Sequence, residues 1–443
     1  MILLFMNIEK SPVQTGLFLC MGRGMKDVSL KISDVGMNGD GIARLENGEV
    51  VFVPFSVPGD IVMAKVGKDH DGQNRAKITS ILLKSPSRTE PPCRHFGVCG
   101  GCSLQHLNEE AYREFKKNQI IWALQKCGVQ MPKVFEHIFI SAGTRRRANF
   151  AAVVTKAKTT IGFHERRSSN IRDVPDCLLI DDDVRVVMEG FRPFLRAIAG
   201  EGAKMDILIQ CVNGAREIAL TGKIAPGWEA QQALADALRT LDLARISLRS
   251  RDYESYEILL EAKPFFASFD SLVVNLAPGA FLQPSEKGER ALTKCVIDGA
   301  GDASCIVDLF CGNGTFTGPL MTNRKIIATD FAPDAIASLQ KAGIDARLRN
   351  LFKEPFGVKE LDGVDCVILD PPRAGAGAQV AQIANSKVNL VVYVSCNSQT
   401  FAKDASVLLG GDFVLEKLTL IDQFIWSPHS EIVGVFRRRA FNA

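Results

Sequence analysis

The chain has 443 residues, 46% of them hydrophobic, so it is long enough for two or three domains with separate cores. Lys and Arg (53) barely exceed Asp and Glu (50), and a formal charge of +3 gives no argument by itself for a nucleic-acid partner. Twelve cysteines are too few for a disulfide scaffold, which excludes that class of secreted protein and favours reduced thiols in a cytoplasmic one.

The first segment, residues 1–25, shows no regular pattern. Its apolar run MILLFM follows no basic residues and precedes no cleavage site, so we do not expect a signal peptide. No part of the chain reaches the roughly 18 apolar residues that a membrane span requires, so we expect no membrane association. We expect residues 1–25 to be a disordered extension.

Residues 26–84 consist of short alternating runs such as VSLKISDV, EVVFVPF and DIVMAKV, separated by the turn signals MNGDG, ENG and VPGD. This spacing predicts a small β-barrel. A barrel of this kind is either a platform for single-stranded nucleic acid or a domain that adds only stability, and its shape does not decide between the two.

Residues 85–271 have a mixed pattern that predicts a central α+β domain. Strand-like runs (ANFAAVVT, KMDILIQCV, REIALTG, RISLRS) accompany two helical stretches, EEAYREFKKNQIIWALQKCG and EAQQALADALRTL. From residue 272 to residue 443, apolar β-branched runs alternate with helical patterns. This alternation predicts a doubly wound parallel sheet, covered by helices on both faces.

A glycine turn follows the first strand of this last domain. The sequence VDLFCGNGT places Gly312 and Gly314 between a strand and a helix, where backbone can approach a ligand closely. The next strand ends in Asp330, an acid suited to ribose hydroxyls. Thr317 stands where a nicotinamide site would have its third glycine, so we expect another nucleoside cofactor. A purely structural tight turn is the alternative.

Two further strands of this domain end in chemically useful residues. Asp370 opens Asp-Pro-Pro-Arg, in which the prolines stiffen a loop at the carboxyl edge of the sheet. Cys396 follows another strand in VVYVSCNSQT, where its thiolate could act as a nucleophile; a buried cysteine that only fills space is the alternative. Glu431, after a Pro-His loop, is the best candidate for a base, with His429 as an orienting group.

A cluster of cysteines is the most specific local signal. Cys93, Cys99 and Cys102 lie in CRHFGVCGGC, whose glycines allow a tight wrap around a metal. A fourth thiolate must come from elsewhere, and Cys177 on a turn is the best choice. Zinc is the alternative occupant, but this spacing favours a [4Fe-4S] cluster.

Together these motifs resemble the RNA uracil-5-methyltransferases, and within them the iron–sulfur branch that modifies 23S ribosomal RNA. The resemblance covers nearly everything after Met25. It identifies residues 26–84 as a TRAM domain, an OB-like barrel that binds RNA, and residues 272–443 as a Rossmann-like domain that uses S-adenosylmethionine. It also implies a [4Fe-4S] cluster on Cys93, Cys99, Cys102 and Cys177.

The resemblance implies a role for each site residue. Cys396 matches the nucleophile and Glu431 the proton-abstracting base. The cofactor contacts implied are Gln283, Phe310, Gly312, Thr315, Asp330, Asn350 and Asp370. Thr315 and Asp330 stand in place of a common Asn and Glu, Ser398 in place of the usual Pro, and Gln-Pro-Ser in place of Gln-x-Asn.

The expected reaction follows from the chemistry of uracil. Carbon 5 is a poor nucleophile until a thiolate adds to carbon 6, so we expect a covalent adduct with Cys396. The uridine must be single-stranded or flipped out to reach the thiolate. Local basic clusters could contact RNA phosphates: Arg145, Arg146 and Arg147; Arg166 and Arg167; Arg249 and Arg251.

We expect a cytoplasmic monomer with 23S rRNA as its substrate. Three alternatives stay open: uridine methylation of tRNA, methylation of an exocyclic amine or ring nitrogen, and a catalytically silent RNA-binding assembly factor. Arg373, where the second alternative would have an aromatic residue, and Cys396 both argue against amine methylation.

Overall fold

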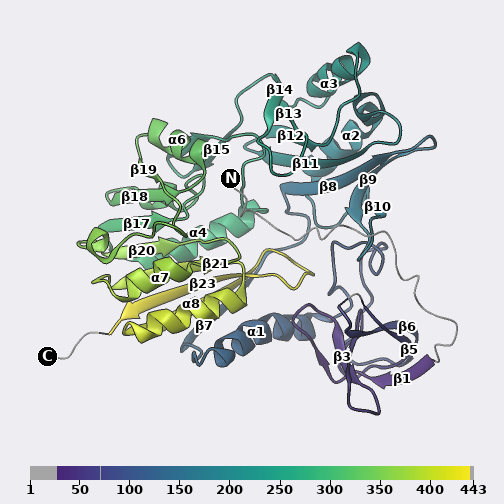
Figure 1. Ribbon diagram of the computed structural model, residues 1–443, viewed down its shortest axis with the longest axis horizontal. Helices are drawn as coiled ribbons and strands as arrows, with labels where there is room; N and C mark the ends of the chain where they lie inside the picture. Colours follow the sequence, from purple (N-terminus) through teal and green to yellow (C-terminus); the bar gives the residue numbers. More distant parts are fainter. Residues whose placement is uncertain (1–26, 70, 440–443) are drawn as a thin grey trace.

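The computed structural model describes residues 27–69 and 71–439 and contains three sheets of six or more strands (Figure 1). The prediction for residues 1–25 lies outside the described part of the chain.

The first sheet is a six-stranded barrel in the order β1-β5-β6-β4-β3-β2. Its strands are β1 (Asp27–Lys31), β2 (Asp34–Val35), β3 (Gly41–Arg44), β4 (Val50–Val53), β5 (Ile61–Lys68) and β6 (Asn74–Leu83). Two register shifts between β5 and β6 bend these long strands, as bulges do, so that the sheet curls around its core. Alternate residues such as Val51 and Val53, or Val62 and Ala64, fill that core, which is the small barrel predicted from the turn spacing.

The central sheet has seven strands in the order β10-β9-β8-β11-β12-β13-β14. They are β8 (Arg147–Val154), β9 (Thr159–His164), β10 (Ile171–Asp173), β11 (Lys204–Val212), β12 (Ala215–Thr221), β13 (Arg245–Arg249) and β14 (Glu257–Glu261). Helices α2 (Asp182–Ala199) and α3 (Trp228–Thr240) pack against it and against each other.

Helix α2 is a long helix that the sequence analysis did not identify. The run VRVVM resembles a strand, and Pro193 lies inside the helix, so local preference argued against a helical segment. Its buried residues nevertheless recur at helical spacing, from Val184 through Val187 and Met188 to Phe191, and Asp181 caps the first turn by accepting a hydrogen bond from the Val184 N–H. Burial of that face against the central sheet decides the conformation.

The third sheet has eight strands in the order β19-β18-β17-β20-β21-β23-β22-β7. Five are parallel, as predicted for residues 272–443: β17 (Cys305–Leu309), β18 (Lys325–Asp330), β19 (Asp345–Leu348), β20 (Cys366–Leu369) and β21 (Leu390–Ser395). The last two strands of the chain, β22 (Phe413–Asp422) and β23 (Glu431–Arg438), form an antiparallel pair, and β23 is also antiparallel to β21.

Both faces of this sheet are covered, so successive strand residues enter different cores. On β20, Val367 and Leu369 pack with α7 (Gly377–Ala384) and α8 (Ser398–Gly410), whereas Cys366 and Ile368 pack with α4 (Glu286–Ala300). The remaining elements of this part are hairpin β15 (Phe266–Phe269) and β16 (Leu272–Asn275), helices α5 (Thr317–Leu320) and α6 (Pro333–Lys341), and the 3-10 helix η1 (Val358–Leu361).

Helix α1 (Glu109–Lys126) and strand β7 (Val134–Phe139) belong by contact to this third sheet, although they precede the central sheet in the chain. Strand β7 pairs in parallel with β22, and α1 packs against α8. Figure 1 shows α1 running from the third sheet to the barrel. This helix therefore connects the third sheet with the barrel.

Candidate active site

Four parallel strands end at one edge of the third sheet. Their order places Asp330 at the end of β18, Phe310 after β17, Asp370 after β20 and Cys396 after β21. Ser395 is paired with Ile432 across the antiparallel β21 and β23, so Glu431 reaches the same edge. Ligands of open α/β sheets bind at such carboxyl ends, so the fold brings the predicted site residues to a site of the expected kind.

The Gly312 turn has the strained, open geometry of a ligand-binding loop. Phe310 has φ of +63°, a left-handed conformation that is rare outside glycine, and Gly312 follows with +53°. A Cβ at Gly312 would meet nothing within 4 Å, so there is space in front of the turn. Asp330 accepts hydrogen bonds from the backbone of Gly312 (3.0 Å) and Ala332 (2.8 Å), which holds its carboxylate beside that space.

Asn350 lies next to this acid. The N–H of Arg349 donates to the carbonyl of Asp330 (2.8 Å), and the Asn350 carboxamide oxygen accepts from Phe352 (3.1 Å). The rings of Phe310 and Phe352 are 5.6 Å apart, which places Phe310 in the same group. Thr315 continues the turn after Gly314 and is partly buried.

Gln283 lies on the other side of the site and is 4% exposed. Its side-chain oxygen accepts from the Gln423 amide (2.8 Å), which is also 3.4 Å from a carboxylate oxygen of Glu431. The sequence analysis did not identify Gln423, which stands between two strands with no motif around it. Through this amide, Gln283 is connected to the proposed base.

Cys396 lies in a short turn between β21 and α8. The Ser395 hydroxyl accepts from the N–H of Asn397 (3.2 Å), and Asn397 caps α8 by accepting from Gln399 (3.0 Å). Burial, with smaller contributions from Glu431 and Asp370, raises the pKa of the Cys396 thiol to about 12, against a lowering effect of Arg373. The resting residue is a neutral thiol whose ionisation depends on the charges around it.

Glu431 is 5% exposed, and burial raises its pKa to about 7, against smaller lowering effects of Gln423 and Arg373. Burial also raises the pKa of Asp370 well above its usual range, and Glu431 adds to that shift. Two carboxyl groups and a thiol with raised pKa values at one edge are a typical arrangement for proton transfer.

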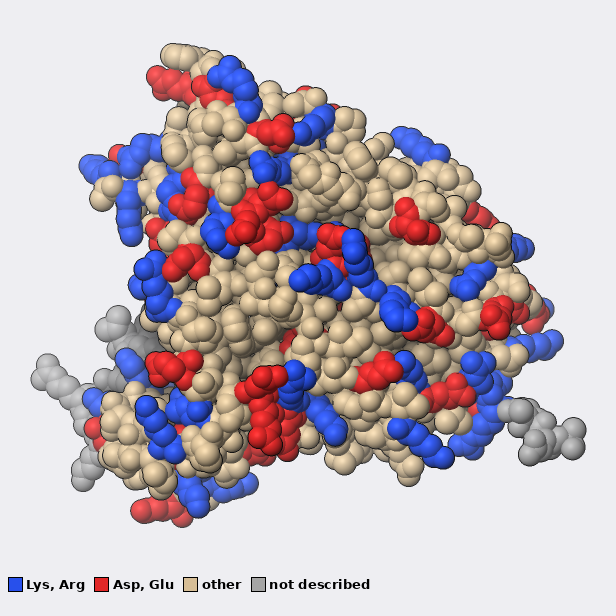
Figure 2. All heavy atoms as spheres, turned by 180° about the vertical axis from the view of Figure 1, so that it is seen from behind, with Lys and Arg blue, Asp and Glu red and all other residues tan. Residues whose placement is uncertain are grey.

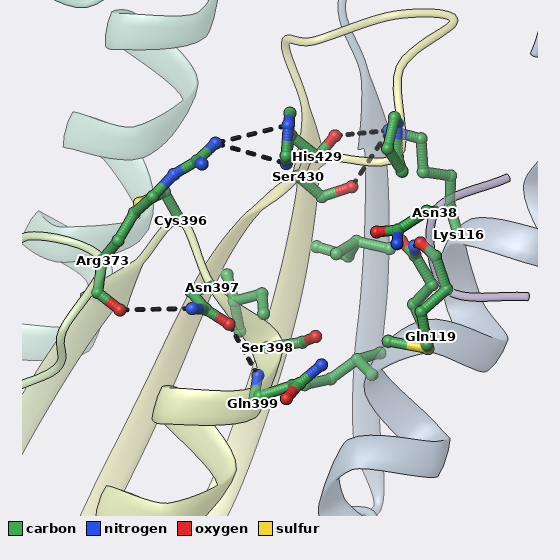
Figure 3. Close-up of a pocket in the computed structure, with 15 residues that line it drawn as sticks. Asn38, Lys116, Gln119, Arg373, Cys396, Asn397, Ser398, Gln399, His429 and Ser430 are labelled. Carbon is green, nitrogen blue, oxygen red and sulfur yellow. Dashed lines mark hydrogen bonds between the residues drawn. The ribbon is translucent and has the colours of Figure 1, made fainter. Parts of the chain in front are cut away.

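Arg373 is a cation that lowers the pKa of both Cys396 and Glu431. The Asn397 amide donates to its carbonyl (3.2 Å), and its guanidinium lies 3.3 Å from Nε2 of His429 (Figure 3). Burial lowers the pKa of His429 to about 4, and Arg373, Lys116 and Arg145 contribute, so the imidazole is neutral at pH 7. The sequence analysis used Arg373 only to argue against amine methylation, because an arginine after Pro-Pro has no established chemistry by spacing alone.

Asp308, inside the first motif, was also missed as a site residue. It is completely buried, the Thr317 hydroxyl donates to one of its oxygens (2.6 Å), and the other oxygen has no hydrogen-bond partner among the described residues. Burial raises its pKa to about 7. A buried acid on β17 thus holds Thr317, at the start of the helix that follows the Gly312 turn.

A cavity of about 150 Å³ opens beside Cys396 (Figure 3). Its lining residues come from the barrel, α1 and the third sheet. They are Met37, Asn38, Lys116, Gln119, Ile120, Arg373, Cys396, Asn397, Ser398, Gln399, Leu420, Pro428, His429, Ser430 and Ile432.

The four predicted cluster cysteines surround a second, smaller cavity of about 20 Å³ with mostly apolar walls. Burial raises the pKa of Cys102 to about 12, with Cys177, Cys99 and Cys93 adding to the shift, so the four thiols are close enough to influence one another. Within the described part of the chain, no group of three His, Cys, Asp or Glu residues is arranged to hold a metal ion. The structure therefore brings the four predicted cysteines to one cavity, but it shows no metal site among the described residues.

Most arginines predicted to contact phosphates have partners inside the protein. Arg146 pairs with Glu289 (2.6 Å), Arg147 donates to Gln210 (2.9 Å), and Arg166 pairs with Asp40 (2.5 Å). Figure 2 shows Lys and Arg in small groups interleaved with Asp and Glu on one face, rather than in one basic field. These clusters have structural roles in this conformation, and their contacts with RNA remain a prediction.

Among the described residues, no helix has the length and apolar character of a membrane span.

A glycine turn with a neighbouring acid, at the carboxyl edge of a parallel sheet and next to a thiol, defines the class of S-adenosylmethionine-dependent methyltransferases. Comparison with known proteins identifies the family. Residues 26–79 match the TRAM domain, and residues 356–440 match the family tRNA (Uracil-5-)-methyltransferase.

Relatives that match over most of the chain support the same family. An uncharacterized RNA methyltransferase of Caulobacter vibrioides is 36% identical over 433 residues, which cover 92% of this chain and 99% of the relative. The 23S rRNA (uracil(1939)-C(5))-methyltransferase of a Shewanella species is 27% identical, covering 92% and 95%. The chain belongs to the RNA uracil-5-methyltransferase family and is an S-adenosylmethionine-dependent enzyme.

A solved structure shows the same fold. The Pyrococcus abyssi tRNA (uracil-54, C5)-methyltransferase, in complex with S-adenosyl-L-homocysteine, aligns with a TM-score of 0.72 at 24% identity. The alignment covers 94% of this chain and 100% of the other. The predicted TRAM domain and methyltransferase fold are thus confirmed.

Proposed function

We propose that this enzyme methylates carbon 5 of a uridine in 23S rRNA through a covalent adduct between Cys396 and carbon 6 of the base. The observation that supports this most is the meeting of Cys396, Asp370 and Glu431 at one sheet edge, with the Gly312 turn two strands away.

Cys396 would start the reaction. Its thiol loses a proton to water, the thiolate adds to carbon 6, and the C5–C6 electron pair moves toward carbon 5 and the carbonyl oxygen as an enolate. Arg373 supports this step, because its positive charge lowers the pKa of the thiol. When bound, S-adenosylmethionine supplies the electrophilic methyl group that carbon 5 takes up.

Glu431 would complete the reaction. Its carboxylate removes the proton from carbon 5, the electron pair restores the C5–C6 double bond, and Cys396 leaves as thiolate. A carboxyl group with a pKa near 7 suits this task, because it is ionised often enough to accept a proton at neutral pH and basic enough to hold it. The Gln423 amide keeps the group oriented.

The residues around the Gly312 turn fit S-adenosylmethionine. The open space at Gly312 admits a ligand against the backbone, and the Asp330 carboxylate lies beside it for the ribose hydroxyls. Phe310, Thr315 and Asn350 lie around the same turn, while Gln283 and Asp370 would face the reacting end. These assignments are proposals for binding experiments.

We also propose a [4Fe-4S] cluster on Cys93, Cys99, Cys102 and Cys177. A donor set of four thiols around one apolar cavity fits it: a single zinc ion needs four sulfurs at about 2.3 Å from one point, whereas a cubane occupies the space between thiolates. The cluster would tie the loop before α1 to the turn before α2. It would shape the RNA-binding region, not the chemistry at Cys396.

The proposed substrate is 23S rRNA, the proposed location is the cytoplasm and the proposed assembly is a monomer, as expected from the sequence. The Shewanella relative acts on 23S rRNA by its name, so ribosomal RNA is the proposed partner, with the target uridine single-stranded or flipped out. Every described cysteine is a free thiol, which agrees with a cytoplasmic location. We propose a monomer.

Nucleoside mass spectrometry of ribosomal and transfer RNA, from cells with and without the gene, tests the function. We expect one or more 5-methyluridines to vanish from 23S rRNA and to return with the wild-type gene but not with Cys396→Ala. Glu431→Gln should accumulate a protein–RNA adduct that survives denaturing electrophoresis, because the carbon-5 proton remains. Full methylation by Cys396→Ala would refute covalent catalysis through this residue; losses confined to tRNA would refute the substrate.

A further inference from the structure

The cavity beside Cys396 has a second wall that the methylation chemistry does not use. Asn38, in the barrel loop between β2 and β3, lies across it from Arg373 and Asn397 in Figure 3, and Met37 of the same loop also lines the cavity. The barrel therefore contributes directly to the surroundings of the nucleophile.

This barrel loop is fixed in position by the rest of the protein. The Gln119 amide of α1 donates to the Met37 carbonyl (2.7 Å). The Asp40 carboxylate is 3% exposed and pairs with Arg75 (2.6 Å) of β6 and with Arg166 (2.5 Å) in the turn after β9. The cavity is thus formed before any ligand arrives, which reduces the entropy cost of binding.

The lining of the cavity suits one nucleobase. A cavity of about 150 Å³ is the size that accepts a single benzene ring. Met37, Ile120 and Leu420 offer apolar surface to the faces of a ring. Asn38, Gln119 and Gln399 offer amide groups, which pair with the hydrogen-bonding edges of bases.

Charge around the cavity favours the same ligand. No Asp or Glu is among the described residues that line it. The Lys116 ammonium uses its three hydrogens on Asp422 (2.8 Å), the His429 carbonyl (2.5 Å) and Ser430 (3.2 Å), so it closes the wall without competing for the ligand. Arg373 is exposed at the other side, where a phosphate could approach.

The target uridine itself does not belong in this cavity. In the proposed function Glu431 acts on the reacting base, while Gln283 and Asp370 face the reacting end of the cofactor, and none of the three lines the cavity. Cys396 lines it and so stands at its boundary with the reaction site. We propose that the cavity is a subsite for the unpaired base of a nucleotide flanking the target uridine, read by Asn38 and Gln399.

This inference rests on the proposed function, and abasic substitution tests it. The probe is an oligoribonucleotide that spans the methylated uridine found by mass spectrometry, with an abasic residue at each of three positions on either side. The double variant Asn38→Ala/Gln399→Ala removes the two most exposed amides of the cavity. Asn47→Ala, at an exposed turn of the same barrel, is the matched control.

With wild-type enzyme, we expect removal of the base at one flanking position to raise KM about tenfold, as loss of a stacked base does. In the double variant, the same removal should change KM threefold or less, whereas Asn47→Ala should behave as the wild type. If removal of the base raised KM equally in the wild type and in the double variant at every position, the inference would be overturned. A double variant that lowers only kcat, equally on all oligonucleotides, would overturn it too, because the cavity would then belong to the target base.

Failure of the proposed function would look different. In that case the wild-type enzyme would leave the intact oligonucleotide unmethylated, and no comparison between abasic positions would arise.

Discussion

At the scale of single residues, the site places groups where their charged forms are disfavoured. Desolvation raises the pKa of both Cys396 and Glu431, Glu431 and Asp370 add to the shift of Cys396, and Arg373 is the cation that opposes both shifts. Such groups cost stability in the folded protein and gain reactivity, as is common at active sites.

Glu431→Gln should stabilise the folded protein at alkaline pH. Below about pH 4.5 the carboxyl is protonated in both the folded and the unfolded chain, and the two proteins should be similar in stability. Between pH 4.5 and 7 the folded wild type keeps a proton that the unfolded chain has released, so its stability falls as pH rises. Above pH 7 the neutral amide should gain about 1–3 kcal/mol. Denaturant unfolding at pH 5 and pH 8 measures this, and a gain that does not grow with pH would contradict it.

Arg373→Ala should make Cys396 less reactive. Without the guanidinium the thiol pKa rises further, so less thiolate is present at pH 8. We expect alkylation of Cys396 by iodoacetamide, followed on its peptide by mass spectrometry, to slow about threefold to tenfold, since the cation is exposed and screened. Arg373→Lys should recover most of the rate. Arg290→Ala, an exposed arginine paired with Glu286, is the control; an alanine variant at Arg373 that alkylates at the wild-type rate would rule out this role.

At the scale of elements, α1 holds the loop between β22 and β23, which carries His429 and leads to Glu431. Lys116 of α1 is fully buried, and so is Asp422, with which it pairs at 2.8 Å. The Tyr112 hydroxyl donates to the same carboxylate and accepts from the N–H of Trp426 (2.9 Å). Two successive turns of one helix thereby fix both ends of the loop.

Lys116→Ala should destabilise the protein and loosen this loop. It leaves Asp422 buried without its cation, a change that costs about 3–5 kcal/mol. We expect a lower free energy of unfolding in urea and a lower kcat, with S-adenosylmethionine binding retained. Arg113→Ala removes an exposed pair with Glu109 on the same helix and should cost under about 1 kcal/mol. A similar loss of unfolding free energy in the two variants would show that the buried pair contributes no more stability than the exposed one.

At the scale of the whole molecule, the barrel, α1 and the third sheet together line the cavity beside Cys396. The loop that carries Cys93, Cys99 and Cys102 is connected to the turn that carries Cys177 by ion pairs as well. His95 and Arg94 both contact Asp176, next to Cys177, at 2.7 and 2.8 Å. A cluster on the four thiols would strengthen the same connection. Its loss should therefore affect RNA binding, not the cofactor site.

Cys177→Ser should lower the iron content of anaerobically purified protein well below four per chain. We expect RNA affinity to fall while calorimetric binding of S-adenosylmethionine stays unchanged, because the cavity that the four thiols line does not include the Gly312 turn. Cys127→Ser, at a thiol outside that cavity, should keep its iron. Wild-type protein that binds stoichiometric zinc and no iron would refute the cluster.

Much of the organisation was predictable from the sequence because it is encoded locally. Turn residues between short alternating runs predicted the barrel, and continuous apolar strands followed by Asp330, Asp370 and Cys396 predicted a parallel sheet with a site at its edge. Period and turn chemistry act over a few residues, so they can be recognised in one sequence. Helix α2 was missed where local preference and tertiary burial disagree.

Only the tertiary structure decided which distant segments are in contact. The link of Gln283 through Gln423 to Glu431, the buried pair of Lys116 with Asp422, and the position of Asn38 beside Cys396 join residues far apart in the chain. The sequence determined which residues could do the chemistry, because strand ends and glycine turns are local features. Their shared cavities and shifted pKa values depend on burial, and burial exists only once the barrel, α1 and the third sheet have packed together.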